Sequence, residues 1–137
     1  MMQSEKQTIF DPLRKKRVVL TPEEEVRQYF IQWLCKERDY PMGLMMSEFT
    51  IAYNKRSFRC DIVCFNSEST PLVIVECKAP SVKIDGGVIE QITRYNMALK
   101  VGCLVITNGV TTFAFAYNNE LHRYVAVNDI PYYKSED

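Results

Sequence analysis

An acid and an amine follow the most apolar segment of the chain. In PLVIVECKAP, residues 71–80, a run of apolar residues ends at Glu76 and Lys78, which are separated by one residue. Because side chains alternate along a strand, Glu76 and Lys78 should share one face, with Cys77 on the other. Asp61 is the only acid of the preceding apolar segment, SFRCDIVCF. A hairpin between the two segments would place Asp61 beside this pair.

Two carboxylates at the end of an apolar strand indicate chemistry with a divalent cation. Carboxylates about 4 Å apart repel each other by several kcal/mol at an effective dielectric constant of about 20. A bound cation removes this cost, and oxygen-rich sites suit Mg²⁺ or Mn²⁺, with water in the remaining positions. The alternative is structural: Glu76 and Lys78 form a salt bridge on one face of the strand, and Asp61 marks the start of its neighbour.

The elements that must position these residues follow from apolar spacing and turn residues. A helix is predicted from the N-cap Thr21 to a position before Pro41, with an apolar stripe along it. A second helix is expected within residues 85–102, with Gly102 as its stop. Strands are expected at residues 47–53, 57–65, 71–78, 103–107, 111–117 and 121–127.

The order of these elements predicts an α/β fold, a mixed β-sheet flanked by helices. The segment NSEST is a turn signal that favours an antiparallel hairpin between the second and third strands. The strand CLVIT should run parallel to PLVIV through the second helix. A closing hairpin is expected across Asn118 and Asn119.

The composition is that of a folded domain with no charge preference. Of 137 residues, 47% are hydrophobic, and 17 Lys and Arg balance 17 Asp and Glu. One domain is expected over residues 1–137, with an extension at 1–17 that carries the basic cluster RKKR and a tail at 125–137. The sequence shows no apolar stretch of about 20 residues, no signal-peptide centre and no GxxxxGK[ST] loop of an ATPase motor. The five cysteines form no CxxC pair and are interpreted as buried, reduced thiols of a cytoplasmic protein.

Together these motifs resemble a known family. The ordered set Asp61, Glu76 and Lys78 resembles the PD-(D/E)XK nuclease signature, and QITRY matches the QxxxY helix motif of one branch of that superfamily. LTPEEEVRQ, VECKAP, QITRYN and ITNG resemble the N-terminal endonuclease domain of type I restriction enzyme R subunits, and small stand-alone relatives of it, over residues 11–124. Cys60 stands where the signature has proline, and the motor and docking regions of the large subunits are absent.

The resemblance implies a restriction-endonuclease-like fold and a role for each residue of the set. Asp61 and Glu76 would hold Mg²⁺ or Mn²⁺ together with the backbone carbonyl of Cys77. Lys78 would hold or deprotonate the attacking water. Gln91 and Tyr95, which share one helix face, would help to place Lys78 or the DNA backbone; otherwise they are a surface Gln beside a half-buried core Tyr. The candidate contacts to nucleic acid are Arg27, Lys83 and Arg94.

A further acid of the site is expected on the first helix, where three glutamates compete. Glu23 is in phase with Val26, so it should face the sheet, and we select it as a catalytic and metal-binding residue. Glu24 is the reserve, because its spacing from the N-cap also fits a capping box. Glu25 points away from the apolar stripe. Arg27, one turn after Glu23, is either its partner or a phosphate contact.

The function that follows from the resemblance is a Mg²⁺-dependent endonuclease acting on DNA phosphodiester bonds, with RNA as the alternative substrate. The competing hypothesis is a non-catalytic module of the same fold that recruits a partner protein or nucleic acid. The expected partners are DNA, a second copy of the chain in a homodimer, and a separate motor or specificity subunit. No contact with a membrane is expected.

Overall fold

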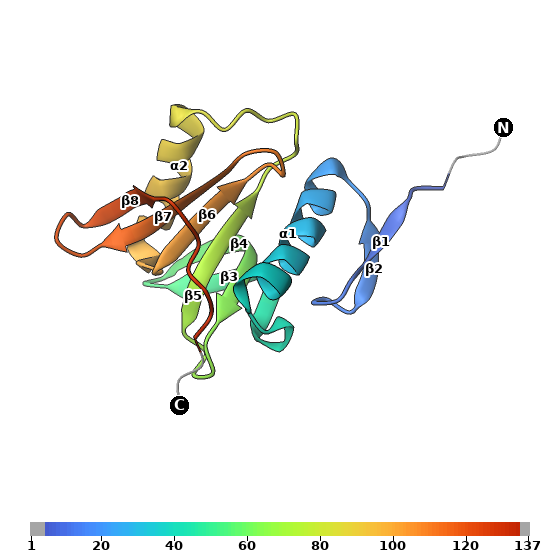
Figure 1. Ribbon diagram of the computed structural model, residues 1–137, viewed down its shortest axis with the longest axis horizontal. Coiled ribbons are helices and arrows are strands. Elements are labelled where there is room, and N and C mark those ends of the chain that lie inside the picture. The colour runs from blue at the N-terminus through green and yellow to red at the C-terminus, as the bar shows by residue number, and fades with distance from the viewer. Residues whose placement is uncertain (1–4, 135–137) are drawn as a thin grey trace.

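A six-stranded mixed sheet forms the centre of the computed structural model, which describes residues 5–134 (Figure 1). The elements in chain order are β1 (Thr8–Asp11), β2 (Lys16–Val19), α1 (Pro22–Arg38), η1 (Met42–Leu44), β3 (Met45–Tyr53), β4 (Arg56–Phe65), β5 (Pro71–Cys77), α2 (Gly86–Asn96), η2 (Met97–Leu99), β6 (Cys103–Thr107), β7 (Thr112–Asn118) and β8 (Arg123–Val127). Residues 1–4 of the expected extension and 135–137 of the expected tail lie outside the described residues.

The α/β class with a mixed sheet is confirmed. The strands lie in the order β3-β4-β5-β6-β7-β8, and β5 and β6 are the parallel pair, joined through α2. The expected hairpins β4–β5 and β7–β8 are both present. β8 extends to Val127, which pairs with Ala114, so the first residues of the expected tail at 125–137 belong to the sheet.

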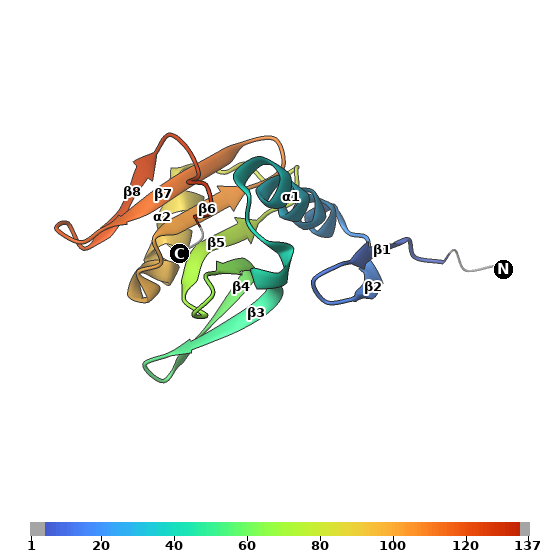
Figure 2. The ribbon, with the colours of Figure 1, turned by 60° about the horizontal axis from the view of Figure 1, so that its bottom comes forward.

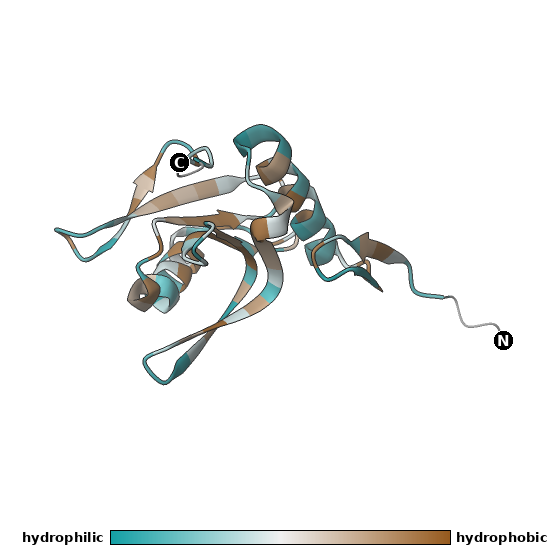
Figure 3. Cartoon of the chain, turned by 90° about the horizontal axis from the view of Figure 1, so that it is seen from below, coloured by the Kyte–Doolittle hydropathy of each residue, from teal (hydrophilic) through white to brown (hydrophobic). Residues whose placement is uncertain are grey.

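The two helices pack on opposite faces of the sheet (Figure 2). One buried cluster joins Val26, Phe30, Ile31 and Leu34 of α1 to alternate strand residues, and the other joins Ile92 of α2 to the residues between them. Apolar segments run through the strands, whereas the hairpin turns are hydrophilic (Figure 3). Both faces of the central strands are therefore buried, as expected for a sheet covered by helices on each side.

Both helices begin at side-chain caps. The Thr21 hydroxyl accepts the backbone N–H of Glu24 at 3.0 Å, and the Asp85 carboxylate accepts that of Val88 at 3.0 Å. Only half of the expected capping box forms, because the Glu24 carboxylate is bonded elsewhere. α2 ends at Asn96 and continues as η2, so the expected stop at Gly102 is wrong.

The expected N-terminal extension contains a β-hairpin that is bound to the rest of the fold. The Asp11 carboxylate, which is fully buried, accepts a hydrogen bond from the Ser47 hydroxyl of β3 at 2.7 Å and pairs with Arg14. Arg14 in turn donates to Glu24 of α1 at 2.7 Å. One member of the basic cluster is therefore an internal ion-pair partner, while Lys15, Lys16 and Arg17 are exposed.

No helix within residues 5–134 is long and apolar enough to cross a membrane. All five cysteines are free thiols; four are buried, as expected, and Cys35 is partly exposed. Burial raises the pKa of the Cys60 thiol to about 12, and it raises that of Cys77 well above its usual value. These thiols are therefore weak nucleophiles, and they serve as core residues.

Candidate active site

Asp61, Glu76 and Lys78 line one cavity at the end of β5, as their spacing in the sequence predicted. The cavity has a volume of about 360 Å³, and its far wall is formed by Gln91 and Tyr95 of α2. Glu76 and Lys78 thus share a face of the strand. The expected burial of the Cys77 side chain on the other face is also confirmed, since it is 1% exposed.

Asp61 reaches this cavity because the alternation of side chains along β4 breaks at that residue. Cys60 belongs to the cluster on the α2 face, and Ile62 belongs to the cluster on the α1 face, so the alternation of side chains breaks between them. Pairing with β5 also ends here, at Ile62 and Val75. The Asp61 carboxylate then accepts the backbone N–H of Cys77 at 2.7 Å. A side chain thus satisfies a strand N–H that the separated backbone of β4 leaves free.

Glu76 is the most perturbed acid of the cavity. Burial raises its pKa to about 8, and the charge of Asp61 adds to this rise while Lys78 opposes it. Its buried Oε1 atom has no hydrogen-bond partner within residues 5–134. Burial also raises the pKa of Asp61, against the lowering effects of the Cys77 N–H and the Arg27 charge. Both acids therefore stand in an environment that disfavours two adjacent negative charges.

The backbone after β5 is held by the turn between β6 and β7. The N–H of Lys78 donates to the Thr107 carbonyl at 2.8 Å, which continues the parallel pairing by one residue. The buried Asn108 side chain donates to the Val82 carbonyl at 2.8 Å and accepts the N–H groups of Val110 and Thr111. Asn108 thus forms a turn after β6 and also anchors the loop that follows Lys78.

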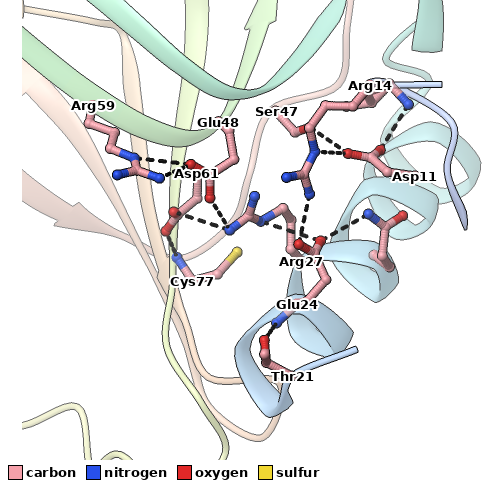
Figure 4. Close-up of polar contacts among 12 residues, drawn as sticks. Asp11, Arg14, Thr21, Glu24, Arg27, Ser47, Glu48, Arg59, Asp61 and Cys77 are labelled. Atoms are coloured by element: carbon pink, nitrogen blue, oxygen red, sulfur yellow. Dashed lines mark hydrogen bonds and ion pairs between the residues drawn. The ribbon is translucent and has the colours of Figure 1, made fainter. Parts of the chain in front are cut away.

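An ion-pair chain lies behind Asp61 (Figure 4). The Arg27 guanidinium is 2.7 Å from Glu48 Oε1, and it is 3.7 Å from both Glu24 Oε2 and Asp61 Oδ1. Glu48 also pairs with the exposed Arg59. Burial acts to raise the pKa of Glu48, but hydrogen bonds from Arg59 and Arg27 hold it below its usual value.

Glu48 is a residue that the sequence analysis missed. It lies opposite Asp61, because the β3–β4 register passes from Ser47 and Ile62 to Phe49 and Cys60. Its backbone has a positive φ of 51°, which interrupts the ladder at this point. An acid within the strand pattern SEFTIAY was the available signal, but its position opposite Asp61 depends on the register.

The first helix does not present Glu23 as expected. Glu23 is exposed, it is absent from the lining of the cavity, and it has no ion pair among the described residues. It lines a neighbouring hollow with Arg27 and Glu48, and its charge adds slightly to the rise in the pKa of Glu76. Glu24, the reserve, is 6% exposed. Its carboxylate accepts hydrogen bonds from Arg14 at 2.7 Å and from Gln28 at 3.0 Å. Glu24 therefore belongs to the ion-pair chain and not to the cavity wall.

The candidate nucleic-acid contacts separate into buried and exposed residues. Arg27 is 4% exposed and pairs with acids other than Glu23, which counts against a contact with phosphate. Lys83 is exposed in the loop before α2. Arg94 is exposed, pairs with Glu90, and lines a second hollow with Arg56, Gln91 and Tyr95.

Gln91 and Tyr95 border both the acidic cavity and this second hollow. The Tyr95 ring is 41% exposed and packs edge-on against the buried Phe58, while its hydroxyl accepts the Arg59 N–H at 3.3 Å. The ring is thus fixed at the rim of the cavity. The expectation that the pair lies near Glu76 and Lys78 agrees with the geometry.

The oxygen atoms of the cavity fit a hard divalent cation. Asp61 and Glu76 present carboxylates to one space, and the unbonded buried oxygen of Glu76 is an available ligand. Within residues 5–134 no three His, Cys, Asp or Glu side chains are grouped as metal ligands. A cation held here would therefore need backbone oxygen or water in its remaining positions, which is usual for Mg²⁺.

The fold and the site define an α/β domain with a restriction-endonuclease-like mixed sheet and a carboxylate-lined cavity where β4 and β5 separate. Residues 22–131 match the family described as type I restriction enzyme R protein N terminus, and the chain belongs to this family. The resemblance noted in the sequence to this domain is thereby confirmed. No curated protein matches the sequence.

Among solved structures, the fold is similar to that of a fragment described as an HsdR subunit of a type I restriction enzyme from Vibrio vulnificus. The TM-score is 0.58 at 17% sequence identity, and the match covers 82% of this chain and 24% of that one. The chain therefore spans about a quarter of the length of that fragment. At this identity the similarity concerns the fold.

Proposed function

We propose that this domain is a Mg²⁺-dependent endonuclease of the PD-(D/E)XK type that hydrolyses DNA phosphodiester bonds. The observation that carries the proposal is the convergence of Asp61, Glu76 and Lys78 on one cavity, with Gln91 and Tyr95 opposite. Membership of the type I restriction enzyme R family supports it. The raised pKa of Glu76, about 8, also supports it, because perturbed pKa values cluster at functional sites.

Each residue of the cavity has a role in this proposal. Asp61 and Glu76 hold the cation with their carboxylates, and the Cys77 carbonyl is the third protein ligand. A cation bound there would polarise the scissile phosphodiester and stabilise the charge that develops on it. Lys78 would hold the attacking water or, in its neutral form, take the proton of that water. When no cation is bound, the positive charge of Lys78 would offset the two acids. Glu23, at the edge of the neighbouring hollow, is the candidate for a further ligand through water.

The nucleic acid would lie along α2 between the cavity and the second hollow. Gln91 and Tyr95 form the shared border of the two spaces, and Arg56 and Arg94 lie on the outer side. This arrangement offers contacts to phosphate rather than to base edges, so recognition would be largely independent of sequence. The same contacts suit RNA, which the cleavage assay must therefore include.

Larger assemblies follow from the same proposal. The family is that of the R subunit of type I restriction enzymes, so a motor or specificity subunit in the cytoplasm is a candidate partner. Cleavage of both strands of a duplex by one small active site requires a homodimer or two successive binding events. The activity could then be latent until such a partner is present.

The test is cleavage of supercoiled plasmid, single-stranded DNA and RNA with Mg²⁺ or Mn²⁺. We expect metal-dependent nicking by the wild type, its loss in Lys78→Ala and Asp61→Ala, and its retention in Lys36→Ala, which replaces an exposed lysine on the last turn of α1. Cleavage that survives in Lys78→Ala would contradict the assignment of the site.

The binding module remains the second candidate because of one observation. The third acid near the cavity, Glu48, is already paired with Arg27 and Arg59, which leaves two carboxylates for a cation. Thermal unfolding with Mn²⁺ separates the candidates. Stabilisation of the wild type but not of Asp61→Ala, without cleavage, would indicate a formed site that awaits a partner or substrate. No stabilisation and no cleavage would favour the binding module.

A further inference from the structure

Arg27 is a buried cation placed among three acids. Its Nη2 atom is 2.7 Å from Glu48 and 3.7 Å from Asp61, while its Nε atom is 3.7 Å from Glu24. Its Nε and Nη1 atoms are buried and have no hydrogen-bond partner among the described residues. Glu48 is therefore the acid that holds the guanidinium at hydrogen-bond distance, and the other two lie beyond it.

The same Nη2 atom lies near both Glu48 and Asp61, so the two acids compete for it. A buried guanidinium without a close carboxylate is costly, and it will move to another acid if its present one is removed. Asp61 is available for this, because its Oδ2 atom is used by the Cys77 N–H while Oδ1 is the atom nearest Arg27. A direct pair between Arg27 and Asp61 would occupy an oxygen of the cavity.

Glu48 is held in place at a local conformational cost. Its φ of 51° lies in the left-handed region, where a residue with a side chain is disfavoured. Arg59 pairs with the same carboxylate from the solvent side. A strained backbone that is kept directly opposite Asp61 is an observation that suggests a role for this side chain.

We propose that Glu48 is a positioning residue: it holds the Arg27 guanidinium away from Asp61, so that the Asp61 carboxylate stays available to a divalent cation. The inference rests on the proposed function, because it takes Asp61 as a ligand of that cation. Arg27 then has two effects. It offsets the charge of the acids when no cation is bound, and it competes with the cation for Asp61.

The test is the affinity for Mn²⁺, measured by isothermal titration calorimetry without substrate. Glu48→Gln should bind Mn²⁺ about 10- to 100-fold more weakly, the size usual for residues that orient metal ligands. Arg27→Met should bind it more tightly than the wild type, because the competitor is gone. The double variant should bind Mn²⁺ as tightly as Arg27→Met alone, because Glu48→Gln then releases no competitor. Glu25→Gln, an exposed acid on the same helix, is the matched control.

The two single variants should change the Mn²⁺ affinity in opposite directions, and this distinguishes a positioning role from a structural one. If Glu48 and Arg27 only supported the fold, both substitutions would weaken Mn²⁺ binding. Unchanged binding in Glu48→Gln, or a loss that persists in the Arg27→Met background, would overturn the inference while the cation site stands. If Glu48→Gln does not fold, Arg27→Met alone decides, since weaker or unchanged binding overturns the proposal. If the wild type binds no Mn²⁺, the proposed function fails together with the inference.

Discussion

The side chain of Asp61 accepts the backbone N–H of Cys77 at 2.7 Å, at the point where β4 and β5 cease to pair. One carboxylate thus has two tasks: one oxygen closes the end of the hairpin, and the other faces Arg27 at 3.7 Å. The break in side-chain alternation along β4 brings Asp61 to the cavity of Glu76 and Lys78. Asp61 therefore has both a structural role and a role in the proposed chemistry.

The two tasks of Asp61 can be separated by two substitutions. Asp61→Asn keeps an acceptor for the Cys77 N–H, whereas Asp61→Ala leaves this N–H without a partner. An unsatisfied buried donor costs about 1–3 kcal/mol, so Asp61→Ala should be less stable than Asp61→Asn by that amount. Urea denaturation without metal measures the difference. Both variants should lose Mn²⁺ binding; equal stability of the two would contradict the structural task.

The raised pKa of Glu76 predicts a pH-dependent effect of its removal. Its pKa is about 8 in the folded state against 4.5 ordinarily, so its contribution to stability is full below about 4.5 and is lost as the pH rises through about 8. Glu76→Gln carries no such loss. Without divalent cations, the stability of Glu76→Gln relative to the wild type should therefore rise between pH 5 and pH 9. Urea unfolding midpoints of both proteins, measured at intervals of about one pH unit, check this. A difference that does not change with pH would show that Glu76 is ionised normally.

Gly109 should tolerate no side chain. Its φ is +84°, and a Cβ atom there would lie 3.2 Å from Cγ2 of Val26 on α1. Gly109→Ala should cost about 1–3 kcal/mol, because it combines a disfavoured backbone with a close contact. Gly43→Ala is the control, since its Cβ would meet nothing within 4 Å. Thermal unfolding of both variants checks the prediction, and equal melting temperatures would contradict it.

The hollow beside α2 should contribute to nucleic-acid binding through charge. Arg56→Ala combined with Arg94→Ala should weaken DNA binding and lower the slope of log affinity against log salt by about 1 for each lost phosphate contact. Arg123→Ala, on the strand at the other edge of the sheet, should leave the slope unchanged. Fluorescence anisotropy over a range of KCl concentrations measures it. An unchanged slope in the double variant would place the nucleic acid elsewhere.

The features predicted from the sequence are those that depend on local periodicity. Glu76 and Lys78 share a face because side chains alternate along a strand, and NSEST closes a hairpin that brings Asp61 near them. The parallel pair β5–β6 follows from the single helix between the two strands. The end of α2 was placed too late, because its spacing pattern continues through η2 after the α-helix has ended.

Only the tertiary structure decided which acids surround Asp61. Glu23 and Glu24 are neighbours on one helix turn, and the burial of Glu24 depends on Arg14, which a hairpin brings from another part of the chain. Glu48 lies opposite Asp61 because of a register and a positive φ that no local pattern signals. Ion pairs between distant segments depend on how the elements pack. The spacing of the sequence thus determined that Asp61, Glu76 and Lys78 come together. Only tertiary packing determined that Arg27 and Glu48 lie beside Asp61.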